Sequence, residues 1–159
     1  MSRKDLHVVL VAPEVPWNCG NVGRSCLAAD AQLHLVEPIG FHLDEKGVRR
    51  AGLDYWSSVL PRVWPDFERL SDQLPPPLLI TPEAEAPLWD WDLRGPVSLV
   101  FGRESEGLPK VLRRRHRRAS LPMPGQAVRS LNVSTTVGIA LWEALRQRTS
   151  RASSFGPGL

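Results

Sequence analysis

The sequence predicts an α/β fold in which helices cover both faces of a central parallel sheet. Short apolar segments alternate with helix-forming segments along the chain, which is the pattern of βαβ units. Residues 6–12 (LHVVLVA) are apolar except for His7 and end at Pro13, which is typical of a strand buried on both faces. Near the C-terminus, four apolar residues recur at every fourth position and predict a long helix that packs against another element: Val133, Val137, Leu141 and Leu145.

The first half of the chain contains three strand candidates and three helix candidates. The strands are expected at residues 6–12, 33–36 and 59–63, the last interrupted by Pro61. The helices are expected at residues 21–31, 45–51 and 65–74, the second of them short and basic. Pro65 suits the first position of its helix, and the prolines at 75–77 end it.

The second half continues the alternation. Strands are predicted at residues 78–81 and 97–101, separated by an acidic stretch that contains Trp89 and Trp91. The clearest helix is predicted at residues 130–147. Residues 149–159 are expected to form a flexible basic tail, so a single domain is predicted at residues 1–148.

Composition narrows the class of protein. Cys19 and Cys26 match neither the spacing of a zinc site nor that of a redox pair, and we expect buried or incidental thiols. The four histidines also lack ligand spacing, so no metal is expected: His7, His34, His42 and His116. No stretch approaches the roughly 20 apolar residues that span a bilayer, and a cytoplasmic location is the default expectation.

Positive charge is concentrated in one place. The formal net charge is only +3, yet five arginines flank His116 within residues 113–118. Such a local field attracts polyanions. A helix end whose cations complement the macrodipole is an equally good interpretation of this segment.

Three loops that follow predicted strands carry unusual residues, and ligands of open α/β sheets gather at such loops. The first is residues 13–24 (PEVPWNCGNVGR). Asn18 or Asn21 can cap the predicted helix. Arg24 is expected one turn into that helix, near its positive end, where a cation is unfavourable unless an anion such as phosphate lies there. A surface arginine that tolerates this small cost is the alternative.

The second loop is residues 101–109 (FGRESEGLP). Gly102 and Gly107 have the spacing of a phosphate loop, but Leu108 and Pro109 replace its lysine and hydroxyl residue. The two glutamates of the loop would also repel a triphosphate. They suit a cationic or hydroxyl-bearing ligand, and the glycines permit close backbone approach. A plain turn from strand to helix is the alternative.

The third loop is residues 121–134 (LPMPGQAVRSLNVS), which leads into the last helix. Ser130 is a natural N-cap for that helix. Asn132 is then expected just inside the helix, where asparagine is a weak helix former. This position favours a functional contact for Asn132.

Together the three loops resemble the signature motifs of the SPOUT superfamily of RNA methyltransferases. The first motif matches at Asn18, Gly20, Asn21 and Arg24, the second throughout residues 101–109, and the third at Pro122, Met123 and residues 130–134. Residues 37–41 (EPIGF) and 49–55 (RRAGLDY) are similar to the single-domain subfamily that methylates the ribose 2′-hydroxyl of tRNA wobble nucleotide 34. Trp142 stands where close members have tyrosine.

The resemblance implies several further features. The C-terminal segment would thread a loop as a deep trefoil knot, an exception to the usual rule against threading. The knot would hold S-adenosyl-L-methionine through the backbone of Ile80, Gly102, Leu121 and Leu131, with the region of Ser130. The protein would be a homodimer in which each active site draws on both subunits.

The resemblance also assigns roles to polar residues. The active site would contain Asn18, Arg24, Glu104 and Asn132, and the residues that face tRNA would be Arg24, Arg113, Arg114 and Arg129. Arginine is proposed as general base in related enzymes. Because its pKa lies above about 12, orienting phosphate and stabilising the alkoxide are simpler roles for Arg24.

The leading hypothesis is therefore ribose methylation at the tRNA wobble nucleotide. An enzyme of the same chemistry that acts on rRNA or on another tRNA position is one alternative. A catalytically silent RNA-binding module of the same fold is the other, and the presence of all four active-site residues argues against it.

Overall fold

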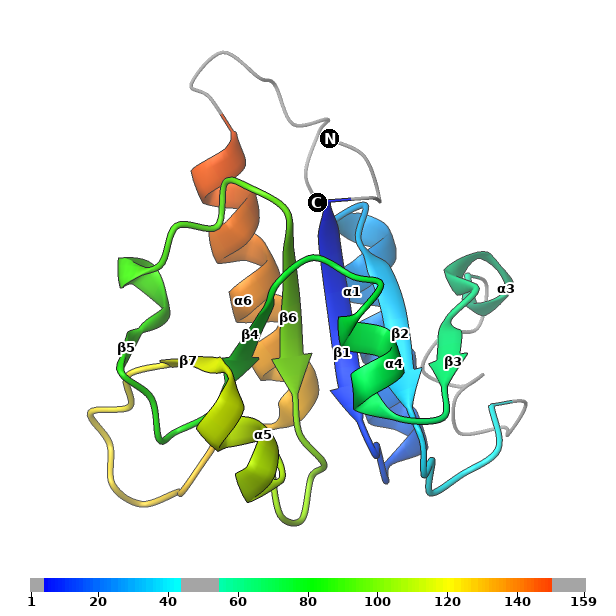
Figure 1. Cartoon of the computed structure of the whole chain (residues 1–159), viewed down its shortest axis with the longest axis horizontal. Helices are drawn as coiled ribbons and strands as arrows, with labels where there is room; N and C mark the ends of the chain where they lie inside the picture. Colours follow the sequence, from blue (N-terminus) through cyan, green and yellow to red (C-terminus); the bar gives the residue numbers. More distant parts are fainter. Residues whose placement is uncertain (1–4, 44–54, 150–159) are drawn as a thin grey trace.

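A computed structural model describes residues 5–43 and 55–149. Within them, seven parallel strands form one sheet in the order β3-β2-β1-β6-β4-β7-β5 (Figure 1). The strands are β1 (Leu6–Val11), β2 (Gln32–Val36), β3 (Arg62–Trp64), β4 (Pro77–Ile80), β5 (Ala86–Pro87), β6 (Val97–Phe101) and β7 (Arg117–Ser120). The helices are α1 (Pro16–Ala28), α3 (Trp56–Val59), α4 (Phe67–Ser71), the 3₁₀ helix η1 (Leu88–Asp90), α5 (Lys110–Arg115) and α6 (Val133–Arg148).

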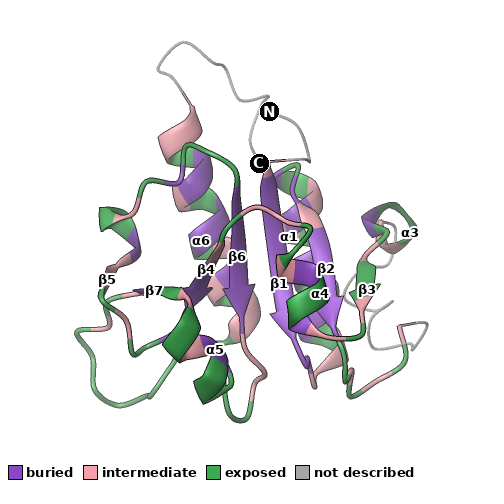
Figure 2. Cartoon of the chain, in the orientation of Figure 1, coloured by how far each residue is buried: buried purple, intermediate pink, exposed green. Residues whose placement is uncertain are grey.

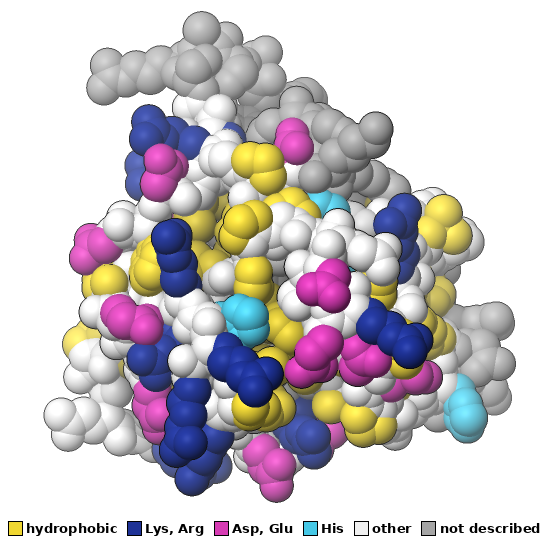
Figure 3. All heavy atoms as spheres, in the orientation of Figure 1, with side chains coloured by type: hydrophobic (Ala, Val, Ile, Leu, Met, Phe, Trp, Pro, Cys, Tyr) yellow, Lys and Arg dark blue, Asp and Glu magenta, His cyan; other side chains and the backbone are white. Residues whose placement is uncertain are grey.

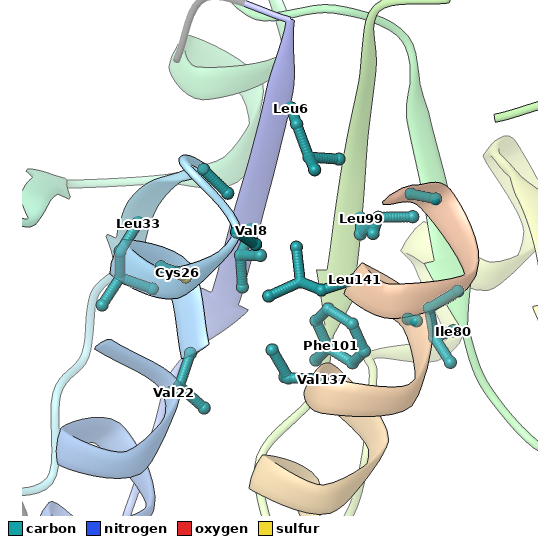
Figure 4. Close-up of a cluster of buried hydrophobic side chains, with 14 of the residues drawn as sticks. Leu6, Val8, Val22, Cys26, Leu33, Ile80, Leu99, Phe101, Val137 and Leu141 are labelled. Carbon is teal, nitrogen blue, oxygen red and sulfur yellow. The ribbon is translucent and has the colours of Figure 1, made fainter. Parts of the chain in front are cut away.

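Helices cover both faces of the sheet, as predicted. The central strands β1 and β6 are therefore buried along their whole length (Figure 2). Alternate residues of β1 point to opposite faces. Leu6 and Val8 belong to a core cluster with residues of α1 and α6, among them Val22, Cys26, Val137 and Leu141 (Figure 4). Val9 and Val11 belong to a second cluster with α4 and α5. Both cysteines are buried free thiols, as expected.

The strand predictions are confirmed more closely than the helix predictions. Strand β6 has the predicted bounds, β1 and β2 each differ by one residue at one end, and β4 is shifted by one residue. Helix α1 begins at Pro16 instead of residue 21, because proline fits the first helical turn, so Asn18 and Asn21 lie inside the helix and neither caps it. The predicted helix at residues 45–51 lies outside the described residues.

Two further element predictions are corrected. Val59 ends α3, Leu60 adopts a left-handed conformation with φ of 47°, and β3 begins only at Arg62. Pro65 does not begin α4. Asp66 is its N-cap, and the Asp66 carboxylate accepts a hydrogen bond from the Arg69 backbone N–H.

The C-terminal part of the chain is threaded. Strand β7 lies between β4 and β5, so the connection that leaves β4 and returns to β6 (residues 81–96) runs around it. The chain from β7 to α6 passes inside this connection, as expected for a C-terminal trefoil knot. The end of α6 is fastened to the same connection: the Arg148 Nε donates to the Leu93 carbonyl at 2.7 Å, and the Gln147 side-chain oxygen accepts from the Leu93 N–H at 2.8 Å.

A chain of three rings, the buried His7 and His34 and the half-buried Trp64, joins β1, β2 and β3. The Trp64 indole N–H donates to His34 Nδ1 at 3.0 Å, and His34 Nε2 lies 2.9 Å from His7 Nδ1. Because indole only donates, Nδ1 of His34 accepts, and the single proton of the neutral ring sits on Nε2 and is donated to His7. Burial first, and then the neighbouring His7 and Arg62, lower the pKa of His34 to about 3.

This pKa predicts that stability falls with acidification below pH 6.5. There the unfolded chain protonates His34 and the folded chain does not, so the free energy of unfolding decreases until the pH reaches the folded pKa, by at most about 1.4 kcal/mol per pH unit. We expect His34→Gln, whose amide can accept from Trp64 and donate to His7, to flatten this slope. Urea unfolding between pH 7.5 and 5 measures it.

A His34→Gln variant with the same slope as the unmodified protein would show that His34 takes up its proton equally in the folded and unfolded states.

Candidate functional site

The three unusual loops meet around a cavity of about 770 Å³ at the carboxyl ends of β4, β6 and β7. Its size is in the range of small-molecule sites. All five residues predicted to hold a methyl donor line it: Ile80, Gly102, Leu121, Ser130 and Leu131. So do five of the predicted polar residues: Asn18, Glu104, Arg113, Arg129 and Asn132. Arg24 and Arg114 are not among the lining residues.

Glu104 reaches from the second loop to the start of α1. Its carboxylate accepts hydrogen bonds from the backbone N–H groups of Glu14 at 2.9 Å and Val15 at 3.3 Å, where Val15 is the N-cap residue of α1. The amide of Asn18 donates to the same carboxylate at 3.2 Å. A negative charge is thus placed at the positive end of a helix that has no side-chain cap of its own.

Asn18 extends this contact to the third loop. The Asn132 side-chain amide donates to the Asn18 Oδ1 at 3.0 Å. The Asn132 Oδ1 in turn accepts from the backbone N–H groups of Ser134 at 2.9 Å and Thr135 at 3.3 Å. Asn132, and not Ser130, is therefore the N-cap of α6, which explains an asparagine at this position.

Glu14 joins the same two loops in the opposite direction, and no sequence pattern pointed to this residue. Its carboxylate accepts from the Ser105 N–H at 3.0 Å and from the Ser105 hydroxyl at 2.8 Å. The two hydrogen bonds from Ser105 hold the pKa of Glu14 below its usual range. The first and second loops are thus joined by hydrogen bonds that run both ways between residues 14–15 and 104–105.

The glycines of the second loop serve the loop itself. A Cβ atom at Gly102 would lie 2.1 Å from the carbonyl carbon of Gly107, so only glycine allows the loop to fold back so closely. Gly107 has a φ of 70°, and its N–H donates to the Arg103 carbonyl at 2.9 Å. Gly102 thus approaches the backbone of its own loop closely, and the predicted approach of these glycines to a ligand stays a prediction.

Arg24 lies far along α1, and its predicted place near the positive end of the helix is wrong. It is the ninth residue of α1, because the helix begins at Pro16. The macrodipole argument for an anion therefore does not apply to it. Its side chain is exposed, and its guanidinium carbon lies 5.5 Å from the centre of the Tyr55 ring.

Two arginines of the basic segment around α5 form ion pairs with acidic residues of the same chain. Arg113 is paired with Glu83 and is only 18% exposed, and Arg118 is paired with Glu85 at 2.9 Å. Arg114 and Arg115 are exposed and form no ion pair among the described residues. In Figure 3, Lys and Arg side chains gather over α5 and β7 with acidic side chains between them. The predicted attraction of polyanions thus concerns part of this surface only.

The described part of the chain contains neither a metal-binding cluster nor a membrane-spanning helix. It holds no group of three or more His, Cys, Asp or Glu side chains placed to bind a metal ion. None of its helices combines the length and apolar character that crossing a membrane requires.

The chain is similar in sequence to known RNA methyltransferases. The model of the SpoU rRNA Methylase family matches residues 5–142. A Burkholderia cenocepacia protein named tRNA (cytidine(34)-2′-O)-methyltransferase is 42% identical over 148 residues, which cover 89% of this chain and 94% of that protein.

Two solved structures share the fold. One, described as giving insights into the 2-OH methylation of C/U34 on tRNA, has a TM-score of 0.86 at 41% identity and covers 92% of this chain and 97% of its own. The other, an AdoMet-bound rRNA methyltransferase from Sinorhizobium meliloti, has a TM-score of 0.81 at 27% identity and covers 94% of this chain and 60% of its own. The predicted α/β fold with its C-terminal knot is confirmed.

The contacts of Glu104 predict a specific loss of stability. In Glu104→Gln an NH₂ group replaces one of the oxygens that face three N–H donors. We expect the free energy of unfolding to fall by about 1–3 kcal/mol, the cost of partly buried N–H donors left without an acceptor. Urea denaturation followed by tryptophan fluorescence measures this loss.

Glu106→Gln is the matched control, because the Glu106 side chain is 75% exposed and pairs only loosely with Arg103, at 3.7 Å. Its effect should stay within about 0.5 kcal/mol. If the two variants were equally stable, Glu104 would not hold the start of α1.

Proposed function

Because the chain belongs to the SpoU rRNA methylase family, we propose that it methylates the ribose 2′-hydroxyl of wobble nucleotide 34 in tRNA, with S-adenosyl-L-methionine as methyl donor. The name of the Burkholderia relative supports this substrate, since the similarity covers nearly the full length of both proteins. The convergence of the three loops on one cavity supports a single catalytic site.

The cavity suits the methyl donor chemically. Ile80, Leu121 and Leu131 give it an apolar lining. Among the described residues, no hydrogen bond uses the backbone of residues 121–131, so the N–H and C=O groups of Leu121 and Leu131 are available to a nucleoside. When bound, S-adenosyl-L-methionine supplies a methyl group on a cationic sulfonium. These observations support the assignment of Ile80, Gly102, Leu121, Ser130 and Leu131 to the donor.

The reaction needs positioning more than proton transfer by a carboxylate. The ribose oxygen attacks the methyl carbon in line, the O–C bond forms as the S–C bond breaks, and the hydroxyl proton passes to solvent. Three N–H donors already occupy the Glu104 carboxylate. We therefore assign Glu104, Asn18 and Asn132 the role of holding the three loops around the two reactants.

Arg24 is proposed to act in the cavity of a partner subunit. It follows Asn18 by six residues on α1, which places it about 9 Å further along the helix axis, and it does not line its own cavity. A guanidinium can bind an RNA phosphate and stabilise the developing alkoxide without losing its proton. Together with Arg114 and Arg129, Arg24 would bind the RNA.

A homodimer supplies the second subunit. Ile139 and Trp142 are 36% and 49% exposed and lie three residues apart on α6, which packs beside α1. Two large apolar side chains on one helix face are typical of an interface. Pairing of two copies through α1 and α6 would cover them and bring Arg24 of one copy toward the other.

Incubation with unmodified tRNA and radiolabelled S-adenosyl-L-methionine, followed by mapping of the product, tests the substrate. We expect one labelled 2′-O-methyl group at nucleotide 34. Label in rRNA, at another tRNA position or on a base would contradict the proposal. Binding of the donor in calorimetry with no turnover on any RNA would favour a silent RNA-binding module.

Complementation tests the shared site. Arg24→Ala should abolish turnover with little change in donor affinity, and Asn132→Ala should abolish turnover by damaging the cavity. In a random mixture, half of the dimers are mixed, and each has one cavity intact and served by an intact Arg24. The mixture should therefore regain about one quarter of the normal activity.

A mixture that stays inactive would place Arg24 in its own subunit's site. Loss of donor binding in Arg24→Ala would show that Arg24 contacts the donor and not the RNA. Sedimentation of the unmodified protein as a monomer would contradict the dimer.

A further inference from the structure

The side chain of Arg24 rests on an aromatic ring. Its guanidinium carbon lies 5.5 Å from the centre of the Tyr55 ring, within the range of a cation–π interaction. Among the described residues, no hydrogen bond or ion pair of Arg24 accompanies this contact. Tyr55 lies in the RRAGLDY segment, to which neither the cavity nor its polar contacts assign a role.

The packing of α3 on α1 sets the place of Tyr55. Tyr55 immediately precedes α3, and Gly23 immediately precedes Arg24. A Cβ atom at Gly23 would lie 2.8 Å from the Trp56 ring and 3.1 Å from a methyl group of Val59. Glycine at this position therefore lets Trp56 sit directly on the α1 backbone. Because Tyr55 directly precedes Trp56, the packing of Trp56 on Gly23 places the Tyr55 ring beside Arg24.

An aromatic ring holds a guanidinium in a way that an acidic side chain does not. A carboxylate would neutralise the charge of Arg24 and occupy two of its N–H groups. A ring contacts the flat face of the group and leaves its five in-plane N–H donors unused. Such a support limits the motion of the side chain while its donors remain available to phosphate and ribose oxygens.

We propose that Tyr55 is a positioning residue that holds Arg24 in its active orientation and leaves all of the arginine's N–H donors free for RNA. This inference rests on the proposed function, in which Arg24 contacts the RNA. Tyr55 acts on the reaction through Arg24.

Three substitutions separate the ring from the other properties of the side chain. Tyr55→Phe keeps the ring, and its kcat for tRNA methylation should stay close to normal. Tyr55→Leu removes the ring and should lower kcat about 2- to 5-fold, the value of an exposed cation–π contact. Tyr55→Glu can hold Arg24 as an ion pair but occupies its donors, and should lower kcat at least as far.

The affinity for S-adenosyl-L-methionine and the thermal stability of each variant serve as checks on folding. Calorimetry should give the same affinity for S-adenosyl-L-methionine in all three variants, because Tyr55 does not line the cavity. Normal kcat in Tyr55→Leu would overturn the proposal. Normal kcat in Tyr55→Glu would overturn the claim that the N–H groups of Arg24 must be free for RNA. A loss in Tyr55→Phe equal to that in Tyr55→Leu would show that the hydroxyl, and not the ring, is responsible.

A second readout does not depend on methylation. The Arg24 Nε–H signal in NMR, assigned with Arg24→Lys, should be shifted by the ring current of Tyr55, and Tyr55→Leu should remove that shift. An unchanged signal in Tyr55→Leu would contradict the contact. If the shift is lost as expected but the unmodified protein does not methylate tRNA, the contact stands and the proposed substrate fails.

Discussion

The site depends on the carboxylate of Glu104, which accepts hydrogen bonds from the backbone at the N-terminus of α1, a helix far from it in sequence. Glu104 accepts hydrogen bonds from the two residues that precede α1 and from Asn18, and Asn18 accepts one from Asn132, the N-cap of α6. Two helix termini and three loops are thereby joined by side chains whose hydrogen-bonding groups are satisfied by one another. Removing any member leaves a polar group without a partner, which costs more than the bond itself contributes.

The sheet makes this connection possible. Strands β1 and β6 are parallel neighbours, so the loops that follow them leave the same edge side by side. The third loop reaches that edge because β7 pairs with β4, next to β6, and because the chain then passes through the connection of residues 81–96. The knot therefore closes the third wall of the cavity, and Gln147 and Arg148 fasten the helix that follows.

Sequence alone placed four of the seven strands of the described sheet closely and predicted residues that line the cavity. Buried strands consist of short apolar runs, so β6 could be placed without error, and each motif residue expected at the donor site lines the cavity. Positions that depend on the start of a helix were less certain. Helix α1 begins at Pro16, five residues before the predicted start, so Arg24 does not lie at its positive end. The cap of α6 is Asn132 and not the predicted Ser130. The contacts of Glu14 and Tyr55 had no local signal, because their partners are 91 and 31 residues away in the sequence.

We propose that Glu104, Asn18 and Asn132 act as one unit that shapes the cavity assigned to the methyl donor. A double-mutant cycle of Glu104→Gln and Asn132→Ala, with the affinity for S-adenosyl-L-methionine measured by calorimetry, tests it most directly. Glu104 and Asn132 are linked through Asn18, so we expect the two losses of binding free energy to overlap by about 0.5–3 kcal/mol in the double variant. Losses that simply add would show that the two residues act independently and would contradict the account.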